Sequence, residues 1–198
     1  MPQLKELLVD QLQDLLHAET QLTGALPKMA DAAHHPKLKE AFQKHLTQTE
    51  GQIERLRKAF ESLGEEAKPK TCKGMMGLIQ EGEETINEGA NRDPLSADLA
   101  LIAAAQRVEH YEISAYGTAR SLARQAGDNT CARLLSRTLG EEESTDYLLT
   151  AIADPLLQKA KLGDMGEDVN LESVARPTGE KSTPTRRRPS RQVEQEVG

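Results

Sequence analysis

The stretch 99–119, LALIAAAQRVEHYEISAYGTA, predicts an amphipathic helix. It is rich in alanine and contains no proline, and its apolar residues recur every three or four positions. Glu112 falls on the apolar stripe, where the pattern calls for a core residue. Because an unpaired ionised carboxylate is costly to bury, Glu112 must be neutralised, paired or bound to a cation.

The composition predicts an all-α domain of the cytoplasm. The 198 residues suffice for one well-cored domain and are rich in helix formers. No segment resembles a transmembrane span or a secretory signal. Cys72 and Cys131 belong to no Cys-x-x-Cys motif, so we expect two reduced thiols. The net charge of −7 argues against nucleic acid as the main partner and is compatible with cation binding.

Apolar periodicity places four long helices and one shorter, irregular helix along the chain. Pro36 suits a first helical turn, Gly64 suits a C-cap, and Asp93 is a typical N-cap. Pro27 and Pro155 are expected to kink or bend the first and last long helices, or to end the first one. The long helices are predicted over residues 3–33, 36–64, 94–126 and 129–161, and the short one over 73–89.

The C-terminal segment, residues 166–198, is predicted to be a disordered tail because Ser, Thr, Pro and charged residues replace the apolar pattern. We therefore divide the chain into a domain, residues 1–165, and this tail. The arginine-rich run 186–191 suits a solubilising role and equally a contact with a membrane or nucleic acid.

An internal repeat relates the two halves of the chain. A shift of 93 residues, without a gap, superimposes His17 and Glu19 on His110 and Glu112 and aligns the apolar stripes of the long helices. The pattern predicts two helix hairpins joined by a long connection, which is the ferritin-like form of the four-helix bundle. The repeat also predicts that Glu19 and Glu112 lie together in the middle of the bundle.

Further carboxylates are expected beside this pair. Glu142 and Asp146 fall on the apolar face of the last helix, Glu109 lies one turn before Glu112, and Glu50 borders the inner stripe and is a candidate to turn inward. Such a cluster is strongly repulsive, and no Lys or Arg falls on the inner stripes at this level. We expect a two-metal site for iron or manganese, formed by Glu19, Glu50, Glu109, Glu112, Glu142 and Asp146. The alternative is a group of protonated core acids, hydrogen-bonded to Tyr111, Tyr116 or Tyr147.

The histidines are weaker candidates than the carboxylates. His17 and His110 each lie two residues from a glutamate, so they point about 200° away around the helix. His34 and His35 are expected in a solvated loop. His45 lies on the inner side of its helix, a turn above the glutamates, and suits either a ligand or a packed core residue.

The motifs resemble the YciE/YciF-type ferritin-like stress proteins over about residues 3–162. They are AETQL at 18–22, HLTQTEGQIER at 45–55, LIAAAQRVEHYEI at 101–113 followed by YGT at 116–118, and TLGEE at 138–142 followed by Thr145 and Asp146. The resemblance implies a ferritin-like bundle, a di-metal site and a link to bacterial stress responses. The Glu-x-x-His pattern of many di-iron bundles is absent from this chain.

Two functions are compatible with these observations. The first is a stress-response protein that binds iron or manganese in the middle of the bundle, oxidises Fe(II) or reacts with peroxide, and has Tyr116 as a nearby hydrogen-bond donor. The second is a non-catalytic helical binding or structural module without metal turnover. In either case exposed apolar faces favour a homodimer.

Overall fold

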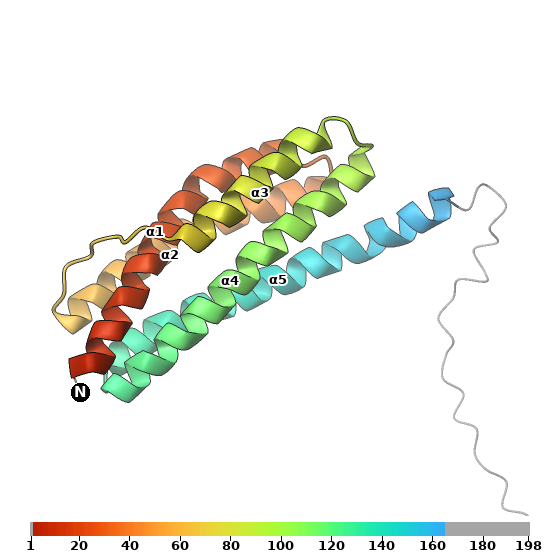
Figure 1. The fold of residues 1–198 in the computed structure, drawn as a ribbon. Helices are drawn as coiled ribbons and strands as arrows, with labels where there is room; N and C mark the ends of the chain where they lie inside the picture. Colours follow the sequence, from red (N-terminus) through yellow and green to blue (C-terminus); the bar gives the residue numbers. More distant parts are fainter. Residues whose placement is uncertain (1, 165–198) are drawn as a thin grey trace, which may run out of the picture.

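The computed structural model describes residues 2–164, so the predicted tail lies outside the described residues. Five helices make up this part of the chain, and Figure 1 shows the long ones running side by side along the molecule. The helices are α1 (Pro2–Ala32), α2 (Pro36–Leu63), α3 (Lys73–Gly89), α4 (Pro94–Ala126) and α5 (Asn129–Asp164). The prediction of an all-helical domain is confirmed for residues 2–164.

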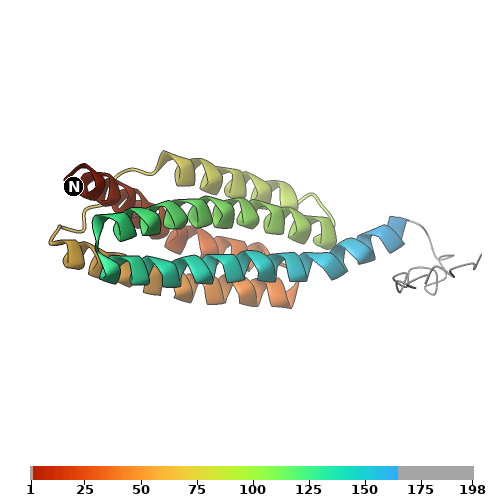
Figure 2. The ribbon, with the colours of Figure 1, turned by 90° about the horizontal axis from the view of Figure 1, so that it is seen from below.

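The helices form a four-helix bundle with an added crossover helix. α1 packs on α2 and α4 packs on α5, while α1–α4 and α2–α5 contacts join the two hairpins. α3 connects the hairpins and packs against α4 and α1 on the outside of the bundle (Figure 2). Two hairpins joined by a long connection are therefore what the internal repeat predicted.

The helix boundaries follow from the capping residues. Asp93 accepts hydrogen bonds from the backbone amides of Leu95 and Ser96, which satisfies two free donors at the start of α4. Gly64 has φ of 67°, in the left-handed region, and ends α2. Pro27 and Pro155 lie inside α1 and α5, so neither proline ends its helix.

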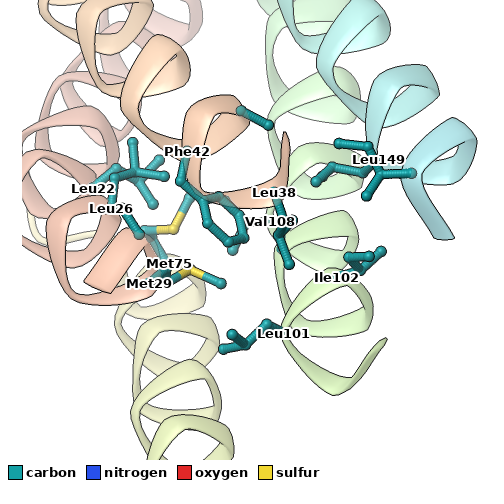
Figure 3. Close-up of a cluster of buried hydrophobic side chains, with 14 of the residues drawn as sticks. Leu22, Leu26, Met29, Leu38, Phe42, Met75, Leu101, Ile102, Val108 and Leu149 are labelled. Carbon is teal, nitrogen blue, oxygen red and sulfur yellow. The ribbon is translucent and has the colours of Figure 1, made fainter. Parts of the chain in front are cut away.

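The core consists of two apolar clusters. One includes Leu22, Phe42, Leu101 and Leu149, and Figure 3 shows these side chains converging from four helices together with Met75 of α3. The second lies around the first halves of α1 and α5 and the last halves of α2 and α4, and its members include Leu8, Leu12, Phe60, Tyr116 and Leu135.

A layer of buried polar side chains lies between these clusters. Its residues come from the middle of α1, α2, α4 and α5, and each is at most 2% exposed. The layer contains Glu19, His45, Thr49, Gln52, Glu109, Glu112 and Glu142. None of the described helices is apolar over a stretch long enough to cross a lipid bilayer.

Candidate metal centre

Three helices bring ligating groups to one point in the polar layer, and a fourth places a carboxylate beside it. His45 of α2, Glu109 and Glu112 of α4 and Glu142 of α5 each offer one ligand atom, and these atoms lie within 4.8 Å of one another. His45 Nε2 is 3.3 Å from Glu109 Oε1 and 3.6 Å from Glu142 Oε2. Glu19 of α1 adjoins the group and is fully buried. We call these five residues the buried cluster.

Helical periodicity explains how each helix points several polar groups inward. Glu109 and Glu112 are three residues apart on α4, so both face the bundle interior, one turn from each other. His45, Thr49 and Gln52 follow the spacing of four and then three along α2, and all three are buried. The polar layer therefore interrupts the same stripes that carry the apolar core above and below it.

The buried cluster is unusual because several of its polar atoms lack hydrogen-bond partners. Among the described residues, ten buried side-chain nitrogen or oxygen atoms have no hydrogen bond, and eight of them belong to the polar layer. They are Glu19 Oε2, His45 Nε2, Thr49 Oγ1, Gln52 Oε1, Glu109 Oε2, both carboxylate oxygens of Glu112, and Glu142 Oε2. Buried polar atoms are normally satisfied, so this concentration is typical of a cation-binding site or of a set of shared protons.

Burial and mutual repulsion act together on the acids. Burial raises the pKa of Glu19, Glu109 and Glu112 well above 4.5, and the neighbouring carboxylates raise each pKa further. Burial also raises the pKa of Glu142, to about 7. Without a cation, the cluster must therefore hold protons at neutral pH.

His45 is neutral, and its unprotonated nitrogen faces the carboxyl groups of the cluster. Burial lowers its pKa from 6.5 to about 4, so the imidazole is neutral. Its Nδ1 lies 3.4 Å from the hydroxyl oxygen of Thr145, and this hydroxyl donates its own proton to the carbonyl of Glu141. The oxygen can then accept from Nδ1–H, which leaves Nε2 unprotonated and facing the carboxylates. An unprotonated nitrogen beside carboxylate oxygens is stabilised by a cation between them.

Glu142 is held from the side of α2. The Gln52 amide donates to Glu142 Oε1 and, at 3.3 Å, to Glu141 Oε2. Arg55 donates to Glu141 and, at 3.0 Å, to the hydroxyl of Thr138. No Lys or Arg was expected on the inner stripes at this level; Arg55 lies off the inner stripe, at the seam between α2 and α5, and its charge counteracts part of the rise in the pKa of Glu142.

Glu19 has one specific partner, Tyr116. The tyrosine is fully buried, and its hydroxyl donates to Glu19 Oε1. Burial raises the pKa of Tyr116, and the charges of Glu19 and Glu112 raise it further, so the phenol stays protonated and acts as a donor. The sequence-based choice of Tyr116 as the nearby donor agrees with this contact, whereas Tyr147 is 75% exposed.

The dimensions of the buried cluster are compatible with a bound metal ion. Metal–oxygen and metal–nitrogen bonds of about 2.1 Å place ligands on opposite sides of an ion about 4.2 Å apart. The four ligand atoms lie within 4.8 Å of one another, so small side-chain movements would close the shell. A set of carboxylates with one imidazole is typical of iron, manganese or zinc.

Two of the carboxylates predicted for the site lie elsewhere. Glu50 is exposed, so the expectation that it turns inward is wrong: Thr49 and Gln52 occupy the inner face of α2 at this height. Asp146 is 24% exposed at the seam between α4 and α5, where it accepts a hydrogen bond from Gln106 and lies 3.3 Å from His110 Nε2. The structure places Glu19, Glu109, Glu112 and Glu142 together, and His45 joins them.

The remaining histidines have other contacts. His17 Nδ1 accepts a hydrogen bond of 3.1 Å from the backbone amide of Cys72, which tethers the start of α3 to α1. The amides of His34 and His35 each donate at 2.8 Å to the carboxylate of the buried Asp98. This carboxylate anchors the α1–α2 loop, a role that no helical pattern reveals. Neither loop histidine belongs to the buried cluster.

A second polar contact joins α1, α3 and α4 near the site. The hydroxyl of Tyr111 donates to Asp14 at 2.6 Å and lies 2.9 Å from the sulfur of Cys72. Both cysteines are free and buried, in agreement with the expectation of reduced thiols. Tyr111 therefore does not serve as a partner for the buried cluster, and its contact instead fixes the crossover helix.

Known proteins resemble the chain over the whole bundle. Protein YciF of Escherichia coli (strain K12) is 46% identical over 154 residues, which are 77% of this chain and 92% of that protein. The crystal structure of the E. coli stress protein YciF superimposes with a TM-score of 0.76 at 44% identity, covering 80% of this chain and 99% of that one. YcfI, described as a putative structural protein from Rhodopseudomonas palustris, gives a TM-score of 0.71 at 38% identity and covers 74% of this chain and 92% of that one.

A more distant likeness concerns the fold alone. A Dps protein from Bacillus brevis, 18% identical, gives a TM-score of 0.58 and covers 77% of this chain and 98% of that one. The family described as a domain of unknown function, DUF892, matches residues 3–161, which include every helix that contributes to the buried cluster. The chain belongs to this DUF892 family, as its resemblance to YciE/YciF-type proteins predicted.

Proposed function

We propose that this protein binds one or two divalent transition-metal ions, iron or manganese, at the buried cluster and acts in stress tolerance. The observation that carries the proposal is the set of eight unpartnered polar atoms in one buried layer. One or two cations would satisfy the unpartnered carboxylate oxygens and His45 Nε2 together, whereas without a cation each of them depends on a carboxyl O–H inside the buried layer. The stress role is proposed because YciF is described as a stress protein.

The chain's own residues would take distinct roles. Glu112 has two free oxygens and lies beside Glu19, so it suits a bridge between two ions. Glu109, Glu142 and His45 would hold an ion on the opposite side, and Tyr116 would fix the orientation of Glu19. A bound iron would supply the chemistry of Fe(II) oxidation or of a reaction with peroxide. The predicted homodimer and cytoplasmic location stay predictions.

The proposal is tested by metal binding to the full chain. Protein purified without chelator should contain iron or manganese, and the metal-free protein should take up Fe(II) or Co(II) at one to two ions per chain. Binding should release protons, because the raised pKa values keep carboxyls protonated in the metal-free cluster. A titration in weakly buffered solution with a pH indicator measures this release.

A matched pair of variants separates metal binding from simple burial of acids. Glu112→Gln should reduce the metal content, whereas Glu50→Gln should not, because Glu50 is exposed on α2. The alternative is a structural module whose core acids are only protonated. It predicts no metal uptake, together with a neutral or stabilising effect of Glu112→Gln, and that result would refute the proposal.

A further inference from the structure

A second polar group lies outside the buried cluster, at the seam between α4 and α5. Asp146 Oδ1 is 3.3 Å from His110 Nε2 and accepts a hydrogen bond of 3.0 Å from the Gln106 amide. The same amide donates to the hydroxyl of Thr150 at 2.8 Å. Asp146 is the one aspartate that the sequence predicts as a metal ligand, and the structure places it at the edge of the predicted site.

The exposed fractions of the side chains place this group between solvent and the buried cluster. The exposed fraction of the side chain is 70% for His110, 24% for Asp146 and 3% for Glu109. Glu109 directly precedes His110 and follows Gln106 by three residues, so it lies between the two α4 residues that contact Asp146. Glu109 Oε2 is buried and has no hydrogen-bond partner. The negative charge of Asp146 contributes to the raised pKa of Glu109, so the two carboxyls interact across the seam. Asp146 itself lies one helical turn after Glu142.

The atoms at this outer position suit brief capture of an ion. Two ligands at about 2.1 Å from one metal and near a right angle to each other lie about 3 Å apart, close to the separation of His110 Nε2 and Asp146 Oδ1. An imidazole and one carboxylate, open to water, form a weak shell. A cation could therefore arrive, exchange part of its water, and pass to Glu109.

The seam on the opposite side of α5 is less suited to cations. There Glu141, 20% exposed, is paired with Arg55, whose side chain is 12% exposed, and also lies 3.3 Å from Arg137. Two guanidinium groups at this entrance repel a divalent cation. In the α4–α5 seam a carboxylate at a similar depth, Asp146, is paired with an exposed imidazole and not with a guanidinium group, so its negative charge is more available to an entering cation.

We propose that Asp146 and His110 form the outer station of the route by which a divalent cation enters and leaves the buried cluster. This inference rests on the proposed metal binding and adds to it a path through the α4–α5 seam, with Glu109 as the inner acceptor. Asp146 thus binds the ion transiently on its way to the buried cluster and is not a ligand of the final site.

The test measures the rates of uptake and release. Metal-free full-length protein is mixed with excess Co(II) in a stopped-flow instrument, and the visible absorption of bound Co(II) gives the uptake rate. Release is then followed after mixing the loaded protein with EDTA. Asp146→Asn should slow both processes by about the same factor, about tenfold, while the final stoichiometry and affinity stay unchanged. His110→Gln, at an exposed position, should slow them in the same direction.

Glu143→Gln is the matched control, because it removes the same charge from an exposed position on α5, three residues before Asp146. Its rates should stay within about twofold of the wild type. Unchanged rates in both seam variants would overturn the proposed route. If Asp146→Asn binds fewer Co(II) ions and releases them faster, Asp146 is a ligand of the final site, and the proposed transit role is wrong. Absence of Co(II) uptake by the wild type would refute the proposed metal binding itself.

Discussion

The metal-free protein should become less stable as the pH rises from 6.5 to about 8. Burial raises the pKa of all four carboxyls in the buried cluster, so the folded state binds more protons than the unfolded state in this range. Stability then falls with increasing pH, because unfolding releases these protons. His45 acts in the opposite direction, since burial lowers its pKa from 6.5 to about 4, but above pH 6.5 its contribution is only about 0.4 kcal/mol.

The size of this effect follows from the shifted pKa values. For Glu142, with a pKa of about 7 in the folded protein and 4.5 ordinarily, the loss between pH 6.5 and 8 is about 1 kcal/mol. Each further carboxyl that keeps its proton through this range adds up to about 2 kcal/mol. Against a typical total stability of about 5–15 kcal/mol, the change is large enough to measure.

Urea unfolding with a chelator present, followed by circular dichroism, provides the assay. The free energy of unfolding should fall across this range, and Glu142→Gln should reduce the fall by about 1 kcal/mol. Glu143→Gln should leave it unchanged, because that side chain is exposed. Saturating metal should reverse the trend, since protons and metal compete for the carboxylates. A metal-free stability that is constant or rises with pH would refute the reasoning.

Three substitutions test contacts around the site by the same unfolding assay. Tyr116→Phe removes the donor to Glu19 and should destabilise the metal-free protein by about 1–3 kcal/mol, with a smaller loss when metal is bound. Asp98→Ala leaves two amides of the α1–α2 loop without acceptors and should cost about 2 kcal/mol without changing metal stoichiometry. Gly74→Ala places a Cβ 2.8 Å from the ring of Tyr111 and should cost about 1–3 kcal/mol. A loss below about 0.5 kcal/mol in any of them would contradict the role given to that contact.

The fold could be predicted from the sequence because its determinants are local or periodic. Apolar spacing places the helices, and Asp93 and Gly64 fix two of their ends through caps that depend on neighbouring residues. The 93-residue repeat adds the long-range information that periodicity lacks. It relates Glu19 to Glu112, and the structure places both in the same buried layer.

The composition of the site was harder to predict because it depends on how one helix slides along another. A helical pattern gives the direction of a side chain around its axis but not its height relative to a facing helix. The sequence pattern therefore places His45 correctly on the inner face of its helix but a turn above the glutamates, whereas the packing of α2 on α5 brings it level with Glu142. Long side chains add a further difficulty, since Arg55 lies off the inner stripe of α2 and still contacts Glu141, the residue beside Glu142.

Residues at the edge of a stripe were the least predictable. Glu50 lies next to Thr49 in sequence, about 100° around α2, and such a position can face either a neighbouring helix or solvent. Whether another helix packs against that side of α2 decides between the two, and the sequence of α2 alone does not contain this information. Asp146, four residues after Glu142, shares its direction but lies where the seam opens to solvent.

The two halves of the bundle contribute unequally to the site, which bears on how it holds metal. The repeat places Leu16 at the position of Glu109 and Thr49 at that of Glu142, so the second hairpin supplies three carboxylates and the first supplies one and the imidazole of His45. Two divalent ions would neutralise four carboxylates, whereas a single ion would leave two buried negative charges or two retained protons. The imidazole lies on the side of Glu109 and Glu142, so two ions would occupy different environments. The ion beside His45 would have both carboxylate and nitrogen ligands, and the other would depend mainly on Glu19 and Glu112.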